Sequence, residues 1–213
     1  EDSLSERFDR KTETGLVDIA VVRLPRISNF TDFNVLEAMD GVSLRYVKRP
    51  EELKDPDMVI LPGTKNTMED LLWLRESGME AAVLKLAGRG KIVYGVCGGY
   101  QMLGQFLHDP DGVEHGGSLK GMGLLPITTT FAGQKTRTRV EGRFLSLSGL
   151  LEPVSGAALE GYEIHMGKTE FVQGAEEKPL VRLDNGIIDG AQQGNVYGSY
   201  VHGIFDREES AKA

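Results

Sequence analysis

The first hundred residues alternate strand-like runs with helical patterns, and this alternation constrains the fold more than any other feature of the sequence. The runs are Val17–Val22, Ser43–Val47, Met58–Leu61 and Ile92–Val96, each about as long as a buried strand. Leucines and alanines at helical spacing, between about residues 71 and 86, separate the last two runs. Strands that alternate with helices in this way predict an α/β fold with a mostly parallel central sheet and helices on both faces.

The second half of the chain has a different pattern. Between about residues 119 and 201, short segments rich in threonine and valine are punctuated by glycine, which predicts antiparallel strands or hairpins added to the sheet. Residues 1–15 are polar and charged and do not begin with methionine. We interpret them as a linker or the tail of an upstream domain, in a fragment or processed chain. Residues 16–213 contain no clear linker, so we expect them to form one domain.

The composition excludes several classes of function. Lys and Arg total 24 against 32 Asp and Glu, a net charge of −8, which disfavours nucleic acid as a partner. No apolar stretch approaches the roughly 20 residues that span a membrane, and the polar start does not look like a secretory signal. The single cysteine, Cys97, excludes an internal disulfide and any multi-cysteine metal site. A reducing, cytoplasmic setting is therefore expected.

The cysteine stands in the segment Gly95-Val96-Cys97-Gly98-Gly99, where the fourth predicted strand ends and residues 100–107 can continue as a helix. This strand–turn–helix pattern is typical of a nucleophile elbow, with cysteine in the place of serine. Glycines two residues before and after it remove side chains that would clash in a sharp turn, and the amide of Gly98 is placed to donate to an oxyanion. A buried structural cysteine is the alternative. The sequence argues against a phosphate-binding turn, because no phosphate-loop motif occurs in it.

A cysteine nucleophile needs a base, and the sequence contains four histidines. His202 follows a predicted strand and lies at the kind of sheet edge where α/β sites collect. His165 is the rival candidate, and the order of residues alone does not select between the two.

Several motifs together resemble a known family. The shorter ones resemble class I, triad-type glutamine amidotransferases: Pro62-Gly63, Gly95–Gln101 and Tyr200–Gly203. The longer ones are similar to the cobyric acid synthase branch of that family: Leu24–Phe33, Leu61–Thr67 and Gly161–Gly167. The resemblance covers about residues 15–206, which is almost the whole chain.

The resemblance implies a flavodoxin-like domain that hydrolyses glutamine. Cys97 would then be the nucleophile and His202 the acid and base, with the amides of Gly63 and Gly98 as oxyanion hole and Gln101 helping to hold glutamine. It also implies an N-terminally fused, ATP-dependent synthetase domain that uses the ammonia to amidate adenosylcobyrinic acid a,c-diamide in cobalamin biosynthesis. ATP and Mg²⁺ are expected in that synthetase domain, and no cofactor or metal is expected in this one.

One position departs from the family pattern. Many relatives have Glu two residues after the histidine, where this chain has Ile204. The sequence therefore favours a Cys97–His202 dyad, with Glu163 as a candidate to orient the ring and a surface carboxylate as its alternative role. A histidine without a fixed partner is a weaker base, so low glutaminase activity is expected for the isolated domain, rising with the synthetase partner and its substrates.

Other functions stay open at this point. Within the enzyme class, the chain could be the glutaminase part of cobyrinic acid a,c-diamide synthase or of an enzyme that amidates a peptidoglycan precursor. It could also be a cysteine hydrolase of other amides. From another class, it could be a catalytically silent, flavodoxin-like docking module.

Overall fold

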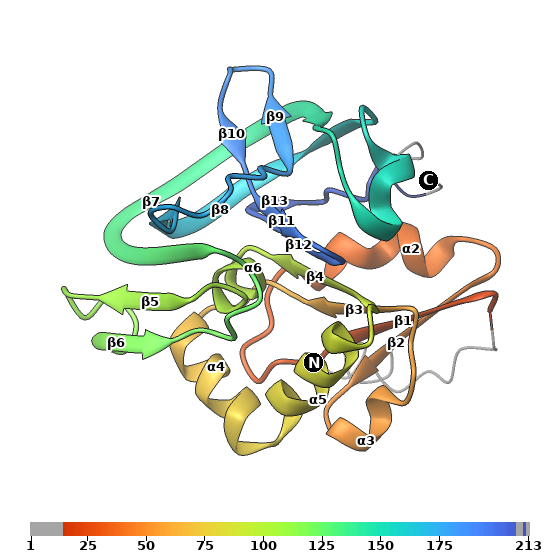
Figure 1. Ribbon diagram of the computed structural model, residues 1–213, viewed down its shortest axis with the longest axis horizontal. Helices are drawn as coiled ribbons and strands as arrows, with labels where there is room; N and C mark the ends of the chain where they lie inside the picture. The colour runs from red at the N-terminus through yellow and green to blue at the C-terminus, as the bar shows by residue number, and fades with distance from the viewer. Residues whose placement is uncertain (1–14, 208–210, 212–213) are drawn as a thin grey trace.

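The computed structural model describes residues 15–207 and 211, apart from the side chains of residues 134–137. These residues form two β-sheets, with helices packed around the first of them (Figure 1). The predicted linker, residues 1–15, lies outside the described residues except for Gly15, so its role stays a prediction.

The first sheet has the predicted alternation. Its order is β11-β12-β4-β3-β1-β2, and every neighbouring pair is parallel except β11 with β12. All four residues of β3 are buried, as expected of a parallel strand covered on both faces. The predicted α/β fold is therefore confirmed. The strands are β1 (Val17–Val22), β2 (Val42–Val47), β3 (Met58–Leu61), β4 (Ile92–Val96), β11 (Ala191–Gln193) and β12 (Val196–Ser199).

Helices cover this sheet, with α3, α4 and α5 below it and α2 above it in Figure 1. The helical pattern predicted between residues 71 and 86 is divided into two helices, because Gly78 has a φ of +78° and breaks it. No helix in the described ranges has the length and apolar character to cross a membrane. The helical elements are η1 (Phe30–Phe33), α2 (Asn34–Ala38), α3 (Pro50–Leu53), α4 (Thr67–Glu76), α5 (Met79–Gly88), α6 (Gly98–Met102) and η2 (Gly149–Val154).

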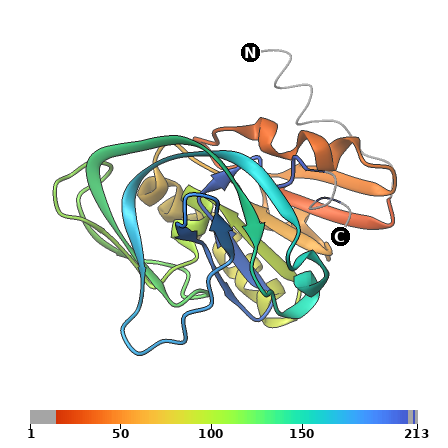
Figure 2. The ribbon, with the colours of Figure 1, turned by 90° about the horizontal axis from the view of Figure 1, so that it is seen from above.

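The second sheet differs from the prediction of hairpins added to the first. Apart from β11, the antiparallel strands pair with one another and build a sheet of their own. Its long strands β7 and β8 form a ribbon that arches over the edge of the first sheet (Figures 1 and 2). Its strands are β5 (Phe106–Asp109), β6 (Gly117–Lys120), β7 (Ile127–Phe144), β8 (Ala158–Phe171), β9 (Val181–Leu183), β10 (Ile188–Asp189) and β13 (Val201–His202).

The helix after the cysteine is shorter than predicted. It ends at Met102, and residues 106–109 form β5, which pairs in parallel with β7. Gly104 lies close to the start of β7, since a Cβ on it would be 2.8 Å from the carbonyl oxygen of Ile127. Strand pairing has therefore overridden the helical spacing of residues 100–107.

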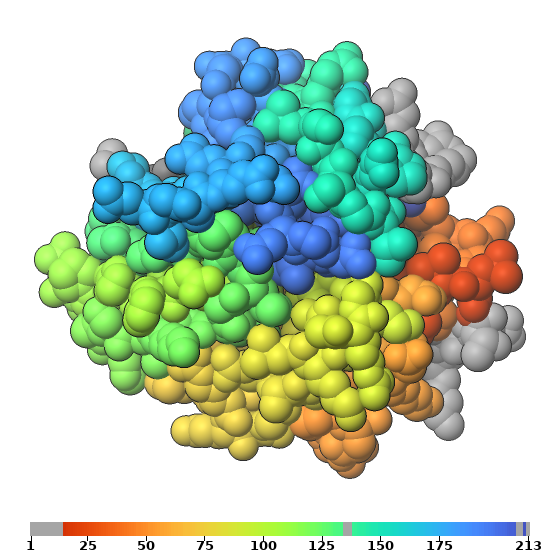
Figure 3. Space-filling view, viewed as in Figure 1, coloured from red at the N-terminus to blue at the C-terminus, as the bar shows by residue number. Residues whose placement is uncertain are grey.

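The site is positioned by three neighbouring strands of the first sheet. Strands β3, β4 and β12 are parallel and in register, so they end at the same edge. The segments that follow them contain Gly63, Cys97 and His202 respectively. Tyr200 alone separates β12, in the first sheet, from β13, in the second. In Figure 3 a dark-blue part of the C-terminal region reaches the surface between the second sheet above and the helices below, although every residue of β12 and β13 is buried.

Candidate active site

Cys97 lies at a strained turn between β4 and α6. Its φ of 52° and ψ of −108° are unusual for a residue with a side chain. The flanking glycines make this turn possible: a Cβ on Gly99 would lie 2.0 Å from the carbonyl oxygen of Leu61, and one on Gly95 would lie 2.6 Å from the amide nitrogen of Tyr100. The turn is therefore the predicted nucleophile elbow in its geometry, with a thiol at its apex.

Two backbone amides near the thiol are free to bind an anion. Gly98 packs against the loop after β3, where a Cβ on it would lie 2.7 Å from Cγ2 of Thr64, and one on Gly63 would lie 2.9 Å from Cε1 of His202. In the described part of the chain, neither the amide of Gly63 nor that of Gly98 donates a hydrogen bond. The structure thus brings both predicted oxyanion-hole residues beside the cysteine and histidine.

His202 is buried, with 1% of its surface exposed, and has partners from distant parts of the chain. Its Nδ1 is 2.7 Å from Oδ2 of Asp32, and the Cys97 side chain lies close enough to raise the pKa of the ring. The side-chain nitrogen of Asn29, Nδ2, is 3.2 Å from Nδ1 and 3.3 Å from Nε2 of the ring. Tyr162 stacks on the ring at 5.2 Å between centroids. The ring is therefore fixed between a thiol and a carboxylate.

The neighbours of His202 favour a protonated imidazole ring. Burial opposes a charge on His202, but its bond to Asp32 and the nearby Cys97 side chain outweigh burial and raise its pKa to about 10. Burial also raises the pKa of Asp32, although its bond to His202 offsets part of that effect. The ring is therefore placed to accept the thiol proton, because Asp32 stabilises the positive charge that the ring would then carry.

Glu163 does not reach this ring. It pairs with Val201, whereas Tyr162 pairs with His202, and residues directly opposite each other share one face of a sheet. Glu163 therefore points to the opposite face from His202, where burial and the charge of Asp189 raise its pKa to about 7. The carboxylate that orients the histidine comes from Asp32 instead, so the site contains a third partner that the predicted dyad lacks.

Gln101 is buried and all of its hydrogen bonds are made within the protein. Its Oε1 accepts from Thr67 Oγ1 at 3.0 Å. Its Nε2 donates to the carbonyl oxygen of Met166 at 3.1 Å and to Tyr200 Oη at 3.0 Å. It lies one turn after the nucleophile, as predicted, but both of its N–H donors are used by the protein in this conformation. Its role in holding glutamine stays a prediction.

His165, the rival histidine, is oriented away from this chemistry. Its ring stacks on Tyr200 at 3.7 Å between centroids, and its Nδ1 is buried without a hydrogen bond among the described residues. Burial, together with the charge of His202, lowers its pKa to about 4. It is therefore neutral near pH 7, and the structure places His202 rather than His165 at the thiol.

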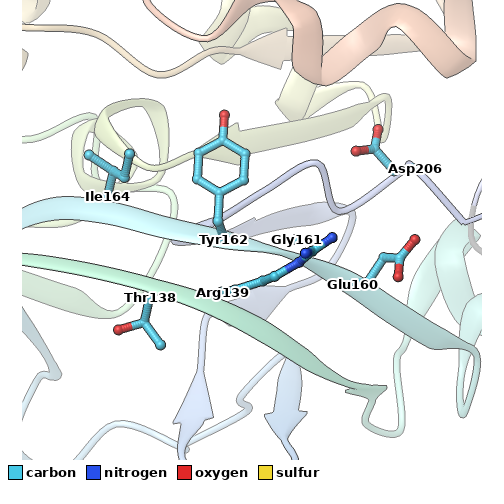
Figure 4. A pocket seen from close by; sticks show the side chains of 7 residues that line it. All are labelled: Thr138, Arg139, Glu160, Gly161, Tyr162, Ile164 and Asp206. Carbon is cyan, nitrogen blue, oxygen red and sulfur yellow. The ribbon is translucent and has the colours of Figure 1, made fainter.

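A surface pocket of about 730 Å³ opens beside the histidine. Figure 4 shows that Tyr162, which stacks on His202, and Ile164 project from the same side of β8 within this pocket. The residues that line the pocket are Thr138, Arg139, Glu160, Gly161, Tyr162, Ile164 and Asp206.

The described part of the site shows no metal-binding cluster. Nowhere in residues 15–207 do three His, Cys, Asp or Glu side chains gather as metal ligands.

Sequence reasoning missed Asp32 and the carbonyl group of Ile164, which accepts a hydrogen bond from the Cys97 thiol at 3.3 Å. One signal for Asp32 was present, since it lies shortly after β1, at the same sheet edge as the cysteine. No local signal marks Ile164, because its contact depends on how β8 crosses the elbow.

Comparisons with known proteins agree with this geometry. Residues 18–210 match the family described as "CobB/CobQ-like glutamine amidotransferase domain". The cobyric acid synthase of Ruminiclostridium cellulolyticum is 56% identical over 98% of this chain, and that of Lachnoclostridium phytofermentans is 51% identical over 100%. The chain spans only 42% and 43% of the lengths of these two relatives. The resemblance inferred from the motifs is therefore confirmed.

Solved structures share the fold. The structure of PurLQS from Thermotoga maritima has a TM-score of 0.66 at 22% identity and covers 87% of this chain and 87% of its own. A second structure, described as a glutamine amidotransferase, has a TM-score of 0.62 at 20% identity and covers 91% of this chain and 94% of its own. These likenesses confirm the flavodoxin-like amidotransferase fold.

Proposed function

We propose that this chain, which belongs to the CobB/CobQ-like glutamine amidotransferase domain family, hydrolyses glutamine at Cys97 and supplies the ammonia to an ATP-dependent synthetase. The observation that carries the proposal is the arrangement of one strained thiol, one histidine held by Asp32, and two unused amides within a single buried site. Each of these groups has a role in cleaving an amide through a thioester.

The reaction begins when the thiol proton moves to Nε2 of His202, because Nδ1 is bonded to Asp32. The thiolate attacks the side-chain amide carbon of glutamine, and the carbonyl oxygen becomes an oxyanion held by the amides of Gly63 and Gly98. The carbon–nitrogen bond then breaks as the imidazolium gives its proton to the leaving nitrogen. Ammonia departs, and a γ-glutamyl thioester remains on Cys97.

Water completes the cycle. His202 accepts a proton from water as the oxygen attacks the thioester carbon, and the same two amides hold the second oxyanion. The carbon–sulfur bond breaks, glutamate is released, and the proton on His202 returns to the sulfur. Asp32 keeps the ring in one tautomer and stabilises its positive charge in both half-reactions.

The relatives support a destination for the ammonia. They are cobyric acid synthases more than twice as long as this chain, which supports an N-terminally fused synthetase part that binds ATP and Mg²⁺. In cytoplasmic cobalamin biosynthesis, this part would amidate adenosylcobyrinic acid a,c-diamide to cobyric acid. Gln101 would hold the glutamine once its bond to Met166 is released.

The test compares Cys97→Ala with the unchanged protein, in the full-length protein that carries this chain. We expect glutamine-dependent amidation to disappear while ammonia-dependent amidation stays the same, because only the ammonia source depends on the thiol. A glutamine analogue with a diazoketone in place of the side-chain amide should alkylate the Cys97 sulfur with loss of N2, adding the mass of the analogue minus dinitrogen. A docking module would show no addition and no loss with alanine, and that result would overturn the proposal.

A further inference from the structure

Strand β8 lies directly across the nucleophile. The carbonyl oxygen of Ile164 accepts a hydrogen bond from the Cys97 thiol at 3.3 Å, and that of Met166 accepts one from Gln101 Nε2 at 3.1 Å. Carbonyls two residues apart in a strand point the same way, so both belong to one edge of β8. The paired strand β13 covers that edge at residues 162 and 163 and then ends. The elbow thus takes the place of a neighbouring strand along β8.

The two groups bound by β8 are those that the proposed reaction needs. The Cys97 sulfur must face the amide carbon of glutamine, and Gln101 is the predicted substrate-binding residue. Only 7% of Cys97 and 2% of Gln101 is exposed. Glutamine and residues 164–167, here called the cover segment, therefore compete for the same donors.

We propose that the cover segment is an autoinhibitory strap, which closes the glutaminase site while Cys97 is a thiol and must be displaced before glutamine binds. This inference rests on the proposed function and adds its regulation. It gives a structural reason for low activity in the isolated domain, because the closed arrangement satisfies Cys97 and Gln101 without substrate.

The chemistry of the thiol makes the closure reversible. A thiol donates its proton to the Ile164 carbonyl, whereas a thiolate has no proton to donate and places negative charge against a carbonyl oxygen. When the proton moves from Cys97 to His202, the contact with Ile164 changes from attractive to repulsive. Activation of the nucleophile and release of the cover segment thus favour each other.

The local structure allows such a movement. Gly167 has a φ of +97°, a conformation that glycine adopts without strain. The pairing of β7 with β8 is irregular beside it, since the register shifts between Thr130 and Lys135. Beyond this point the segment is anchored by Thr169, whose Oγ1 is 2.5 Å from Tyr200 Oη. The same hydroxyl is 2.6 Å from Thr129 Oγ1 on β7. An irregular ladder next to one anchoring side chain is suited to local opening.

Hydrogen–deuterium exchange tests the displacement directly. We expect covalent loading of Cys97 with the diazoketone glutamine analogue to increase exchange in peptides covering residues 163–168, while peptides from β3 and β4 stay protected. If Cys97 is loaded but exchange in 163–168 is unchanged or reduced, the strap is wrong and the glutaminase stands. If the analogue never reacts with Cys97, the proposed function itself fails.

A pair of variants tests the anchor. Thr169→Val removes the hydrogen bonds of Thr169 to Tyr200 and to Thr129, and we expect iodoacetamide to alkylate Cys97 at least about fivefold faster, the factor that one hydrogen bond of about 1 kcal/mol represents. Thr128→Val is the matched control on β7, because Thr128 has no side-chain bond to β8 among the described residues. Equal alkylation rates in the two variants would overturn the anchoring role of Thr169, with folding of each checked by circular dichroism.

Discussion

The two sheets contribute to the site in different ways. The first sheet supports the nucleophile through close backbone contacts, such as those of Gly95 and Gly99, which leave no room for a side chain. The second sheet reaches the site through single hydrogen bonds from β8 and through the two-residue strand β13. The first sheet therefore holds the proposed nucleophile in place, whereas the proposed base and the cover segment belong to the second sheet.

The largest effect is expected at Asp32, which follows β1 of the first sheet in the chain and bonds His202 of the second sheet. Asp32→Asn removes the carboxylate that bonds His202, so we expect kcat for glutamine hydrolysis to fall about 10²- to 10⁴-fold, as when the carboxylate of a comparable triad is replaced. The loss should also lower the pKa of His202, so the alkaline limb of the kcat/KM profile should move to lower pH.

Steady-state kinetics across pH 6 to 10 measures both effects, with Asp40→Asn, an exposed aspartate near the end of α2, as the control. If the pH profile of Asp32→Asn were unchanged, His202 would not depend on its hydrogen bond to Asp32.

The second-largest effect should distinguish Gly99, which packs tightly against backbone, from Gly88, which has open space around it. In Gly99→Ala, the new Cβ would clash with backbone at Leu61 that cannot move aside, so we expect a loss of about 3 kcal/mol or more in the free energy of unfolding. Gly88→Ala is the matched control, because nothing lies within 4 Å of its position and alanine is favoured in helices. Urea unfolding should show the first variant destabilised and the second unchanged or stabilised. Equal midpoints would contradict the rigidity assigned to the first sheet.

The smallest effect concerns Glu163, which lies on the opposite face of the second sheet from His202. Burial and Asp189 raise the pKa of Glu163 to about 7, so the folded state holds that proton more tightly than the unfolded chain does. This carboxyl group therefore lowers the free energy of unfolding progressively as pH rises from about 4.5 to 7, and the deficit stays constant above that.

Glutamine cannot ionise, so Glu163→Gln should be more stable than the natural protein by roughly 1 to 3 kcal/mol at pH 8, with a smaller difference at pH 5. Urea midpoints at the two pH values measure this, and Glu141→Gln, an exposed glutamate on β7, provides the reference. A difference that is the same at both pH values would show that Glu163 is not held protonated.

The contrast between the sheets also explains what could be predicted from the sequence. The strands at residues 17–22, 58–61 and 92–96 and the cysteine turn are local patterns, and the structure contains all of them. The face on which Glu163 lies depends instead on strand register, because a shift by one residue reverses it. The bond between Asp32 and His202 joins residues 170 positions apart, which no local pattern in one sequence specifies.

The passage of the chain through Tyr200 has a further consequence. Cys97 follows β4 of the first sheet, whereas His202, two residues after Tyr200, belongs to β13 of the second sheet. A change in the tilt of the β7–β8 ribbon would therefore change the distance between the Cys97 sulfur and the His202 ring, because the ribbon and His202 belong to the same sheet and Cys97 does not.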